Sequence, residues 1–270
     1  GDLIQSAKKF SVANHFHICV WIVVDEAGKV FPGIYDSVFT ARPGHTSRND
    51  VWWKEREFRD PAHWRRGASE RRYVAAFRDG TAVGYATYRQ KAKWENSIAN
   101  GLVTVVELLG VDTNARLSLW SLLCSIDLFP TVTADNQPPD LELPWQVANR
   151  RAIQRKELDG MYVRVLDVPG ALGARRYGTS DRITIEVVDT MGIADGTYAL
   201  EGSPDGASCS PTTETADVTM DVATLSALYL GADLADTLAR AGRIDGSGEA
   251  VARFGAMLRS PLAPHCPEVF

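Results

Sequence analysis

Near the start of the chain, a continuous run of apolar residues is followed by apolar residues spaced at the period of a helix. Residues 18–24 are apolar and rich in β-branched and aromatic types, which predicts a short buried strand. From Glu26 to Thr40 the apolar residues gather on one side of a helix, and Asp25 is its predicted N-cap. Pro32 falls inside this predicted helix, where it removes a backbone hydrogen bond.

Two strand-like segments flank an Asp-Gly pair further along this half. Residues 72–77 and 82–89 have strand composition, and Asp79-Gly80 between them is typical of a tight hairpin turn. The other predicted elements of this half are a helix from Asn49 or Asp50, a strand over 102–111, a helix from Asp112 or Asn114 to about Leu128, and a strand over 131–134.

The pattern changes near Asp159-Gly160, where short strands separated by turn residues give way to helices. The predicted elements are a strand over 163–168, a helix from Pro169 to Tyr177, strands over 182–188, 196–200, 208–212 and 218–222, and helices over 223–230, 234–241 and 248–259. Both halves therefore have an α+β order, and we expect two domains, 1–155 and 156–270.

Composition excludes several classes of partner. A net charge of -5 and an isoelectric point near 5.6 favour neither nucleic acid nor an anionic membrane. No segment reaches the roughly 20 apolar residues of a membrane span, so we expect a soluble, cytoplasmic protein. The four cysteines have no metal-ligand spacing, so no metal is expected. Basic residues between Arg56 and Arg72 alternate with acidic ones, which predicts a solvated face of mixed charge.

The C-terminal segment is unusually stiff for a chain end. Three prolines precede a terminal aromatic residue, Phe270, and each proline lowers the entropy lost on docking. Burial of the Phe270 ring would bring the α-carboxylate into the fold, where it could orient a cation or accept a proton. The alternative is a packed tail whose carboxylate lies in water.

Several blocks of sequence carry a resemblance to a known family. They are Ala263-Pro-His-Cys-Pro-Glu-Val-Phe270, the segment from Leu158 to Tyr177, Leu225-Ser-Ala-Leu-Tyr-Leu-Gly231, Arg66-Gly-Ala-Ser-Glu-Arg-Arg-Tyr-Val74 and Trp120-Ser-Leu-Leu-Cys-Ser-Ile-Asp-Leu128. Together they resemble the Eis-type (enhanced intracellular survival) N-acetyltransferases of actinobacteria over about Val20 to Phe270.

The resemblance implies a fold and a missing part. Eis proteins have an acetyl-CoA-binding GNAT domain, a degenerate GNAT domain and a sterol-carrier-protein-like domain. This chain is similar to the second and third, so the acetyl-CoA-binding domain is expected to be absent. No Arg/Gln-x-x-Gly-x-Gly/Ala turn for the pyrophosphate is found, since Gly170–Gly173 and Gly242–Gly248 lack the required strand before a helix. Acetyl-CoA is therefore expected as co-substrate of the intact enzyme, with none bound by this chain alone.

The resemblance also implies site residues. The carboxylate of Phe270 corresponds to the base that deprotonates the incoming amine in the family, and apolar surroundings would raise its pKa toward a useful value. Asp159 corresponds to a carboxylate that binds the cationic substrate, although Asp-Gly is also good turn chemistry. Glu268 lies one place from a substrate-binding Glu of some members.

Two functions follow as hypotheses. In the first, the chain is the C-terminal portion of an Eis-type enzyme that acetylates amines of aminoglycosides or lysine, is inactive alone and forms a homo-oligomer. In the second, it is a stand-alone ligand-binding, lipid-binding or scaffold module that has lost acetyl-CoA binding.

Overall fold

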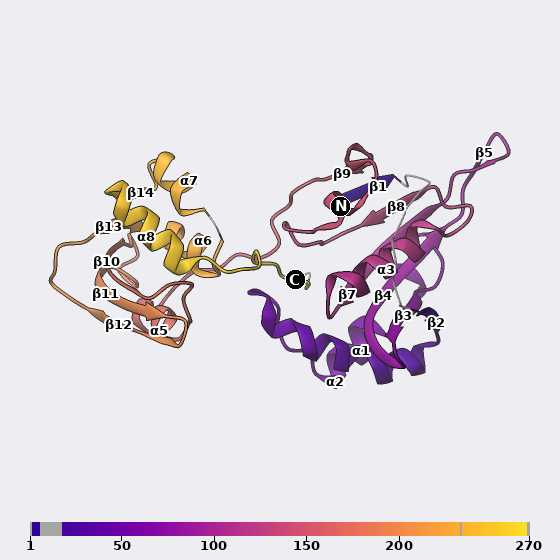
Figure 1. Ribbon diagram of the computed structural model, residues 1–270, viewed down its shortest axis with the longest axis horizontal. Coiled ribbons are helices and arrows are strands. Elements are labelled where there is room, and N and C mark those ends of the chain that lie inside the picture. Colours follow the sequence, from indigo (N-terminus) through magenta and orange to yellow (C-terminus); the bar gives the residue numbers. More distant parts are fainter. Residues whose placement is uncertain (1, 6–17, 233, 269–270) are drawn as a thin grey trace. The chain divides into compact units, whose positions relative to one another are not determined.

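The computed structural model describes residues 2–5, 18–232 and 234–268 of the chain. The chain forms two compact units, which Figure 1 shows. One unit contains the chain up to Leu158 together with the C-terminal residues from Cys266, and the other is Asp159–His265. The predicted domains followed sequence order, whereas by contacts the C-terminal segment groups with the first unit.

A mixed sheet forms the centre of the first unit. Among the described residues its strand order is β2-β3-β4-β7-β8-β1-β9. Neighbouring strands are antiparallel except β7 and β8, which are parallel and joined by α3 (Thr113–Cys124). The strands are β1 (Asp2–Gln5), β2 (Ile18–Ile22), β3 (Arg72–Arg78), β4 (Thr81–Lys91), β7 (Leu102–Gly110), β8 (Thr131–Ala134) and β9 (Ile153–Gln154), with a separate hairpin of β5 (Trp94–Glu95) and β6 (Ile98–Ala99).

The parallel pairing covers all of β8 but only part of β7. Strand β7 pairs with β8 only from Leu102 to Val105, and then continues to Gly110 against β4. Glu107 lies in this second stretch, where β8 has already ended. The edge of β7 opposite β4 is thereby left open to other segments of the first unit.

Helices cover both faces of this sheet because its central strands alternate in side-chain direction. Tyr73 and Ala75 of β3 pack with α1 (Val24–Val38), and Val74 and Ala76 pack with α3. The α1 side also contains α2 (Asp50–Trp52), which continues as a π-helix over Trp53–Glu57. The remaining helical segments are Phe39–Ala41, Ala62–Trp64, α4 (Leu143–Gln146) and Arg150–Ala152.

The second unit is a smaller sheet with short helices. Its strand order, over the part of the chain that is described, is β12-β11-β10-β13-β14. Arg175 donates to the carbonyl oxygens of Tyr229 and Leu258, at the ends of two helices. The elements are α5 (Val168–Gly173), β10 (Asp181–Val188), β11 (Gly196–Ser203), β12 (Gly206–Pro211), β13 (Val218–Asp221), α6 (Val222–Tyr229), α7 (Ala235–Arg240), β14 (Ile244–Gly246) and α8 (Gly248–Leu258).

The α+β prediction is confirmed, and so is the hairpin turn, where Asp79 and Gly80 both have positive φ. The strand predicted over 163–168 is wrong, because Asp167 caps a helix that begins at Val168. The N-cap prediction is also wrong: the first helix begins at Val24, so Asp25 lies in its first turn. None of the helices in the described ranges is long and apolar enough to span a bilayer.

Candidate functional site

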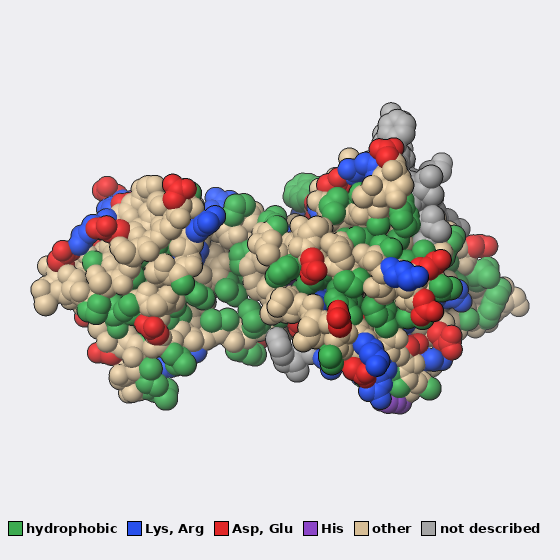
Figure 2. Space-filling model, turned by 90° about the horizontal axis from the view of Figure 1, so that it is seen from below, with side chains coloured by type: hydrophobic (Ala, Val, Ile, Leu, Met, Phe, Trp, Pro, Cys, Tyr) green, Lys and Arg blue, Asp and Glu red, His purple; other side chains and the backbone are tan. Residues whose placement is uncertain are grey.

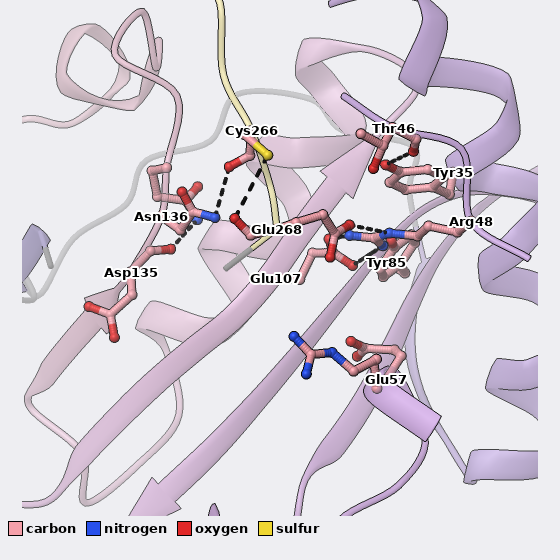
Figure 3. Close-up of polar contacts among 12 residues, drawn as sticks. Tyr35, Thr46, Arg48, Glu57, Tyr85, Glu107, Asp135, Asn136, Cys266 and Glu268 are labelled. Atoms are coloured by element: carbon pink, nitrogen blue, oxygen red, sulfur yellow. Dashed lines mark hydrogen bonds and ion pairs between the residues drawn. The ribbon is translucent and has the colours of Figure 1, made fainter. Parts of the chain in front are cut away.

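The C-terminal segment Cys266–Glu268 is held on the first unit by two polar contacts, which Figure 3 shows. Oε1 of Glu268 accepts a hydrogen bond from Nε of Arg48 at 2.9 Å. Asn136, two residues beyond β8, donates its amide to the carbonyl oxygen of Cys266 at 3.0 Å. The segment therefore binds where β8 has ended and β7 continues.

Arg48 uses two edges of its guanidinium for two different carboxylates. Its Nη1 and Nη2 donate to the two oxygens of Glu107 at 3.0 and 2.7 Å, which is the strong bidentate geometry. Its Nε faces Glu268. The Arg48 side chain is only 1% exposed, and those of Glu107 and Glu268 are 12% and 11% exposed. A buried cation is thus neutralised by two anions from distant parts of the chain.

Aromatic rings fix the Arg48 guanidinium from both sides. Its carbon lies 3.9 Å from the ring centre of Tyr35 and 3.8 Å from that of Trp52, within cation–π distance. The Tyr35 hydroxyl donates to the carbonyl of Thr46, which ties the loop before Arg48 to α1. Asn49 caps α2 by accepting the N–H of Trp52 at 2.8 Å. The Asn49 cap therefore fixes the start of α2, so that Trp52 stacks on Arg48.

Burial and nearby charges shift the pKa values of Tyr85, Tyr35 and Arg48 in this cluster. The Tyr85 hydroxyl donates to Glu107 at 2.7 Å, and burial raises the pKa of Tyr85 well above its usual value. Burial also raises the pKa of Tyr35 to about 12. Burial alone would lower the pKa of Arg48, but the Glu107 carboxylate raises it above the usual value. Arg48 is consequently a permanent cation that can hold an anion but cannot transfer a proton.

A second buried ion pair lies in the segment predicted to be a solvated face. Oε2 of Glu57 forms an ion pair with Nη1 of Arg71 at 3.0 Å, and the two side chains are 6% and 8% exposed. Oε1 of Glu57 has no hydrogen-bond partner in the described part of the chain. Burial raises the pKa of Glu57 to about 7. The prediction fits the exposed pair of Glu55 and Arg59 but is wrong for Glu57 and Arg71.

The sequence-predicted site residues fall in three different situations. Phe270 lies outside the described residues. Glu268 belongs to the first unit, where its carboxylate is paired with Arg48. Asp159 begins the second unit, is exposed, and accepts a hydrogen bond from the Tyr162 hydroxyl at 2.9 Å. The sequence analysis missed Arg48 and Glu107. No sequence motif predicts the Arg48 site, because its two carboxylate partners, Glu107 and Glu268, lie 59 and 220 residues away in the chain.

The start of α3 is not arranged to hold a phosphate. This helix follows β7, and its N-cap is Asp112, whose carboxylate accepts the N–H of Ala115 at 2.8 Å. The same carboxylate pairs with Arg78. A helix N-terminus favours an anion, but here the protein's own carboxylate already occupies that position. In the described ranges no group of three or more acidic, His or Cys side chains could hold a metal ion.

The surface gives little further indication of a ligand. A hollow of about 440 Å³ lies beside β2 and β3, lined in part by Trp21, Arg72 and Tyr88. Neither Asp159 nor Glu268 is among its lining residues. On the face presented in Figure 2, acidic and basic side chains are interspersed without a continuous field of one sign. That face offers no extended patch for a polyanion.

Comparison with known families defines the class of each unit. Residues 44–165 match the acetyltransferase (GNAT) domain, and residues 168–267 match the sterol carrier protein domain. The chain therefore consists of a GNAT-like domain followed by a sterol-carrier-protein-like domain, as the resemblance predicted.

The individual proteins similar to this chain include several N-acetyltransferases. An uncharacterized N-acetyltransferase of Streptomyces griseus is 33% identical over 246 residues, covering 90% of this chain and 59% of that protein. The N-acetyltransferase Eis of Mycobacterium tuberculosis is 31% identical over 216 residues, 79% of this chain and 50% of that protein. Eis1 from Mycobacterium abscessus has the same fold, with a TM-score of 0.81 at 24% identity over all of this chain and 67% of that one. The chain thus has Eis-like homologues and spans 50–60% of the length of the curated relatives it matches.

Proposed function

We propose that this chain works as the C-terminal portion of an Eis-type N-acetyltransferase, in the cytoplasm and within a homo-oligomer. In this role it supplies the C-terminal carboxylate of Phe270 as the base that deprotonates the acceptor amine. Asp159 is proposed to bind the cationic acceptor, an aminoglycoside or a lysine side chain, and Glu268 is a second proposed substrate-binding carboxylate. Acetyl-CoA is bound by sequence outside these 270 residues.

The return of the C-terminal segment to the first unit carries this proposal. Glu268 is paired with Arg48, and only two residues separate Glu268 from the carboxylate of Phe270. Two residues span at most about 7 Å, so the proposed base acts close to this anchor. A negative overall charge further favours a cationic acceptor.

The start of α3 supports placing the acetyl donor elsewhere. A pyrophosphate needs unoccupied N–H groups at a helix N-terminus. Here the Asp112 carboxylate accepts the N–H of Ala115 and would repel a second anion. We therefore expect no productive acetyl-CoA site in the GNAT-like domain of this chain.

A turnover assay tests the proposal. The 270-residue chain is mixed with acetyl-CoA and an aminoglycoside, and release of coenzyme A thiol is followed against a sample without acceptor. We expect no release above that control, whereas the N-acetyltransferase Eis of Mycobacterium tuberculosis serves as the longer positive control. Sustained turnover by this chain would refute the claim that the donor site lies outside it.

A binding assay separates this proposal from the stand-alone lipid-binding alternative. Titration calorimetry with an aminoglycoside should give binding that weakens about tenfold in Asp159→Asn, because one carboxylate contact to a cation is lost. Native mass spectrometry of the purified chain should show no bound lipid. Bound lipid together with absent aminoglycoside binding would favour the alternative.

A further inference from the structure

We propose that Arg48 is the positioning residue for the C-terminal segment, and that Glu107 positions Arg48. This inference rests on the proposed function, because the segment matters to the reaction only if its carboxylate takes part. The anchoring itself is a separate physical claim that can be measured without any acetyl transfer.

The donor geometry of Arg48 leaves one edge for the tail. Both Nη atoms are engaged by Glu107 in a bidentate pair at 3.0 and 2.7 Å. Nε, on the adjacent edge, binds Oε1 of Glu268 at 2.9 Å. Because the guanidinium is planar and rigid, the bidentate pair fixes the direction in which Nε points.

The surroundings of Arg48 prevent it from following a mobile tail. Its guanidinium lies between the rings of Tyr35 and Trp52, and a third ring, Trp53, lies 5.1 Å away. Trp53 and Tyr35 are buried, and Glu107 is on a central strand of the sheet. The anchor is therefore part of the folded core, and the tail must come to it.

A neutral contact supplements the ionic one. Asn136 donates to the Cys266 carbonyl, so the segment is fixed at both of its described ends. Cys266, within this docked segment, is only 6% exposed. Release of the segment would expose its thiol, which makes Cys266 a built-in probe of the anchored state.

The test uses alkylation of Cys266 in the full 270-residue chain. The rate of iodoacetamide labelling is measured by peptide mass spectrometry, with Cys124 and Cys209 in the same molecule as references for global unfolding. Glu268→Gln removes the ionic partner at the tail without altering the core. We expect it to raise the labelling rate of Cys266 at least tenfold while the rates of Cys124 and Cys209 stay unchanged.

A double-mutant cycle assigns the effect to the pair. Arg48→Gln should also raise Cys266 labelling, and Glu268→Gln in that background should add less than about twofold, because the partner is already gone. Arg48→Lys should restore part of the protection. If Arg48→Gln does not fold, Glu107→Gln tests the anchor outside the cycle: it should also raise Cys266 labelling, because the bidentate pair that orients Arg48 is lost.

A matched control separates anchoring from general destabilisation. Asp60→Asn breaks another partly buried ion pair of the same unit, between Asp60 and Arg89 at 2.6 Å. It should leave Cys266 labelling unchanged. The proposal is overturned if Glu268→Gln has no effect on Cys266, or if Asp60→Asn raises its labelling equally. Tail anchoring with no aminoglycoside binding would instead count against the proposed function alone.

Discussion

Glu57 gives this protein a pH dependence of stability that can be calculated. Burial raises the pKa of Glu57 from 4.5 to about 7. A carboxyl with a raised pKa in the folded state stabilises the fold fully below about pH 4.5, and this contribution is lost as the pH rises to about 7. A difference of about 2.5 pKa units corresponds to about 3 kcal/mol of unfolding free energy. The substitution Glu57→Gln removes the titratable carboxyl group but keeps the size and shape of the side chain.

Urea unfolding between pH 4 and pH 8 measures this effect. The stability of Glu57→Gln relative to the natural chain should rise by about 3 kcal/mol across that range, whatever its absolute value at pH 4. Glu55→Gln is the matched control, because Glu55 lies on the same helical segment with a side chain 46% exposed. As an exposed surface substitution, it should change the unfolding free energy by no more than about 0.5 kcal/mol. Parallel curves for Glu57→Gln and the natural chain would refute the reasoning.

Three further predictions concern the second unit. Arg175→Met should lower the unfolding free energy by about 2–3 kcal/mol in urea, because charge-assisted bonds to two helix-end carbonyls are lost; an effect below 1 kcal/mol would contradict this. Asp189→Asn should speed amide hydrogen exchange of the loop after it about tenfold, since its carboxylate accepts backbone N–H groups there; unchanged exchange would count against it. Gly202→Ala should lower the free energy of unfolding by about 1–3 kcal/mol, measured by thermal unfolding, because the added Cβ would lie 2.6 Å from the buried Tyr177 ring. Gly206→Ala is the control, because a Cβ there meets open space and should leave the stability unchanged.

Local chemistry made much of the fold predictable from sequence. Asp79-Gly80 specifies a turn in which both residues have positive φ, and Asn49 specifies a helix start through its side chain. The strand predicted over 163–168 failed because its apolar residues are not held by a neighbouring strand. Val165 instead donates its N–H to the hydroxyl of Ser226, a partner that only the tertiary fold supplies.

Of the candidate site, only the docking of the C-terminal segment was predictable from the sequence. The prolines before Phe270 indicated a docked C-terminal segment, and Cys266–Glu268 does pack on protein. The residue that receives it, Arg48, lies in a polar stretch with nothing to separate it from an exposed arginine. Its burial depends on Glu107 and Glu268 arriving from other elements, which no local pattern encodes.

The grouping of Cys266–Glu268 with the first unit determines how this protein can be cut into parts. A fragment that stops at Leu158 would contain Arg48 and Glu107 but would lack the third member of that charge cluster. A fragment that starts at Asp159 would end in a C-terminal segment that lacks Arg48 and Asn136, the residues that bind it. Recombinant dissection should therefore join the last residues to the first fragment through a short Gly/Ser linker, and a bulky affinity tag after Phe270 is best avoided.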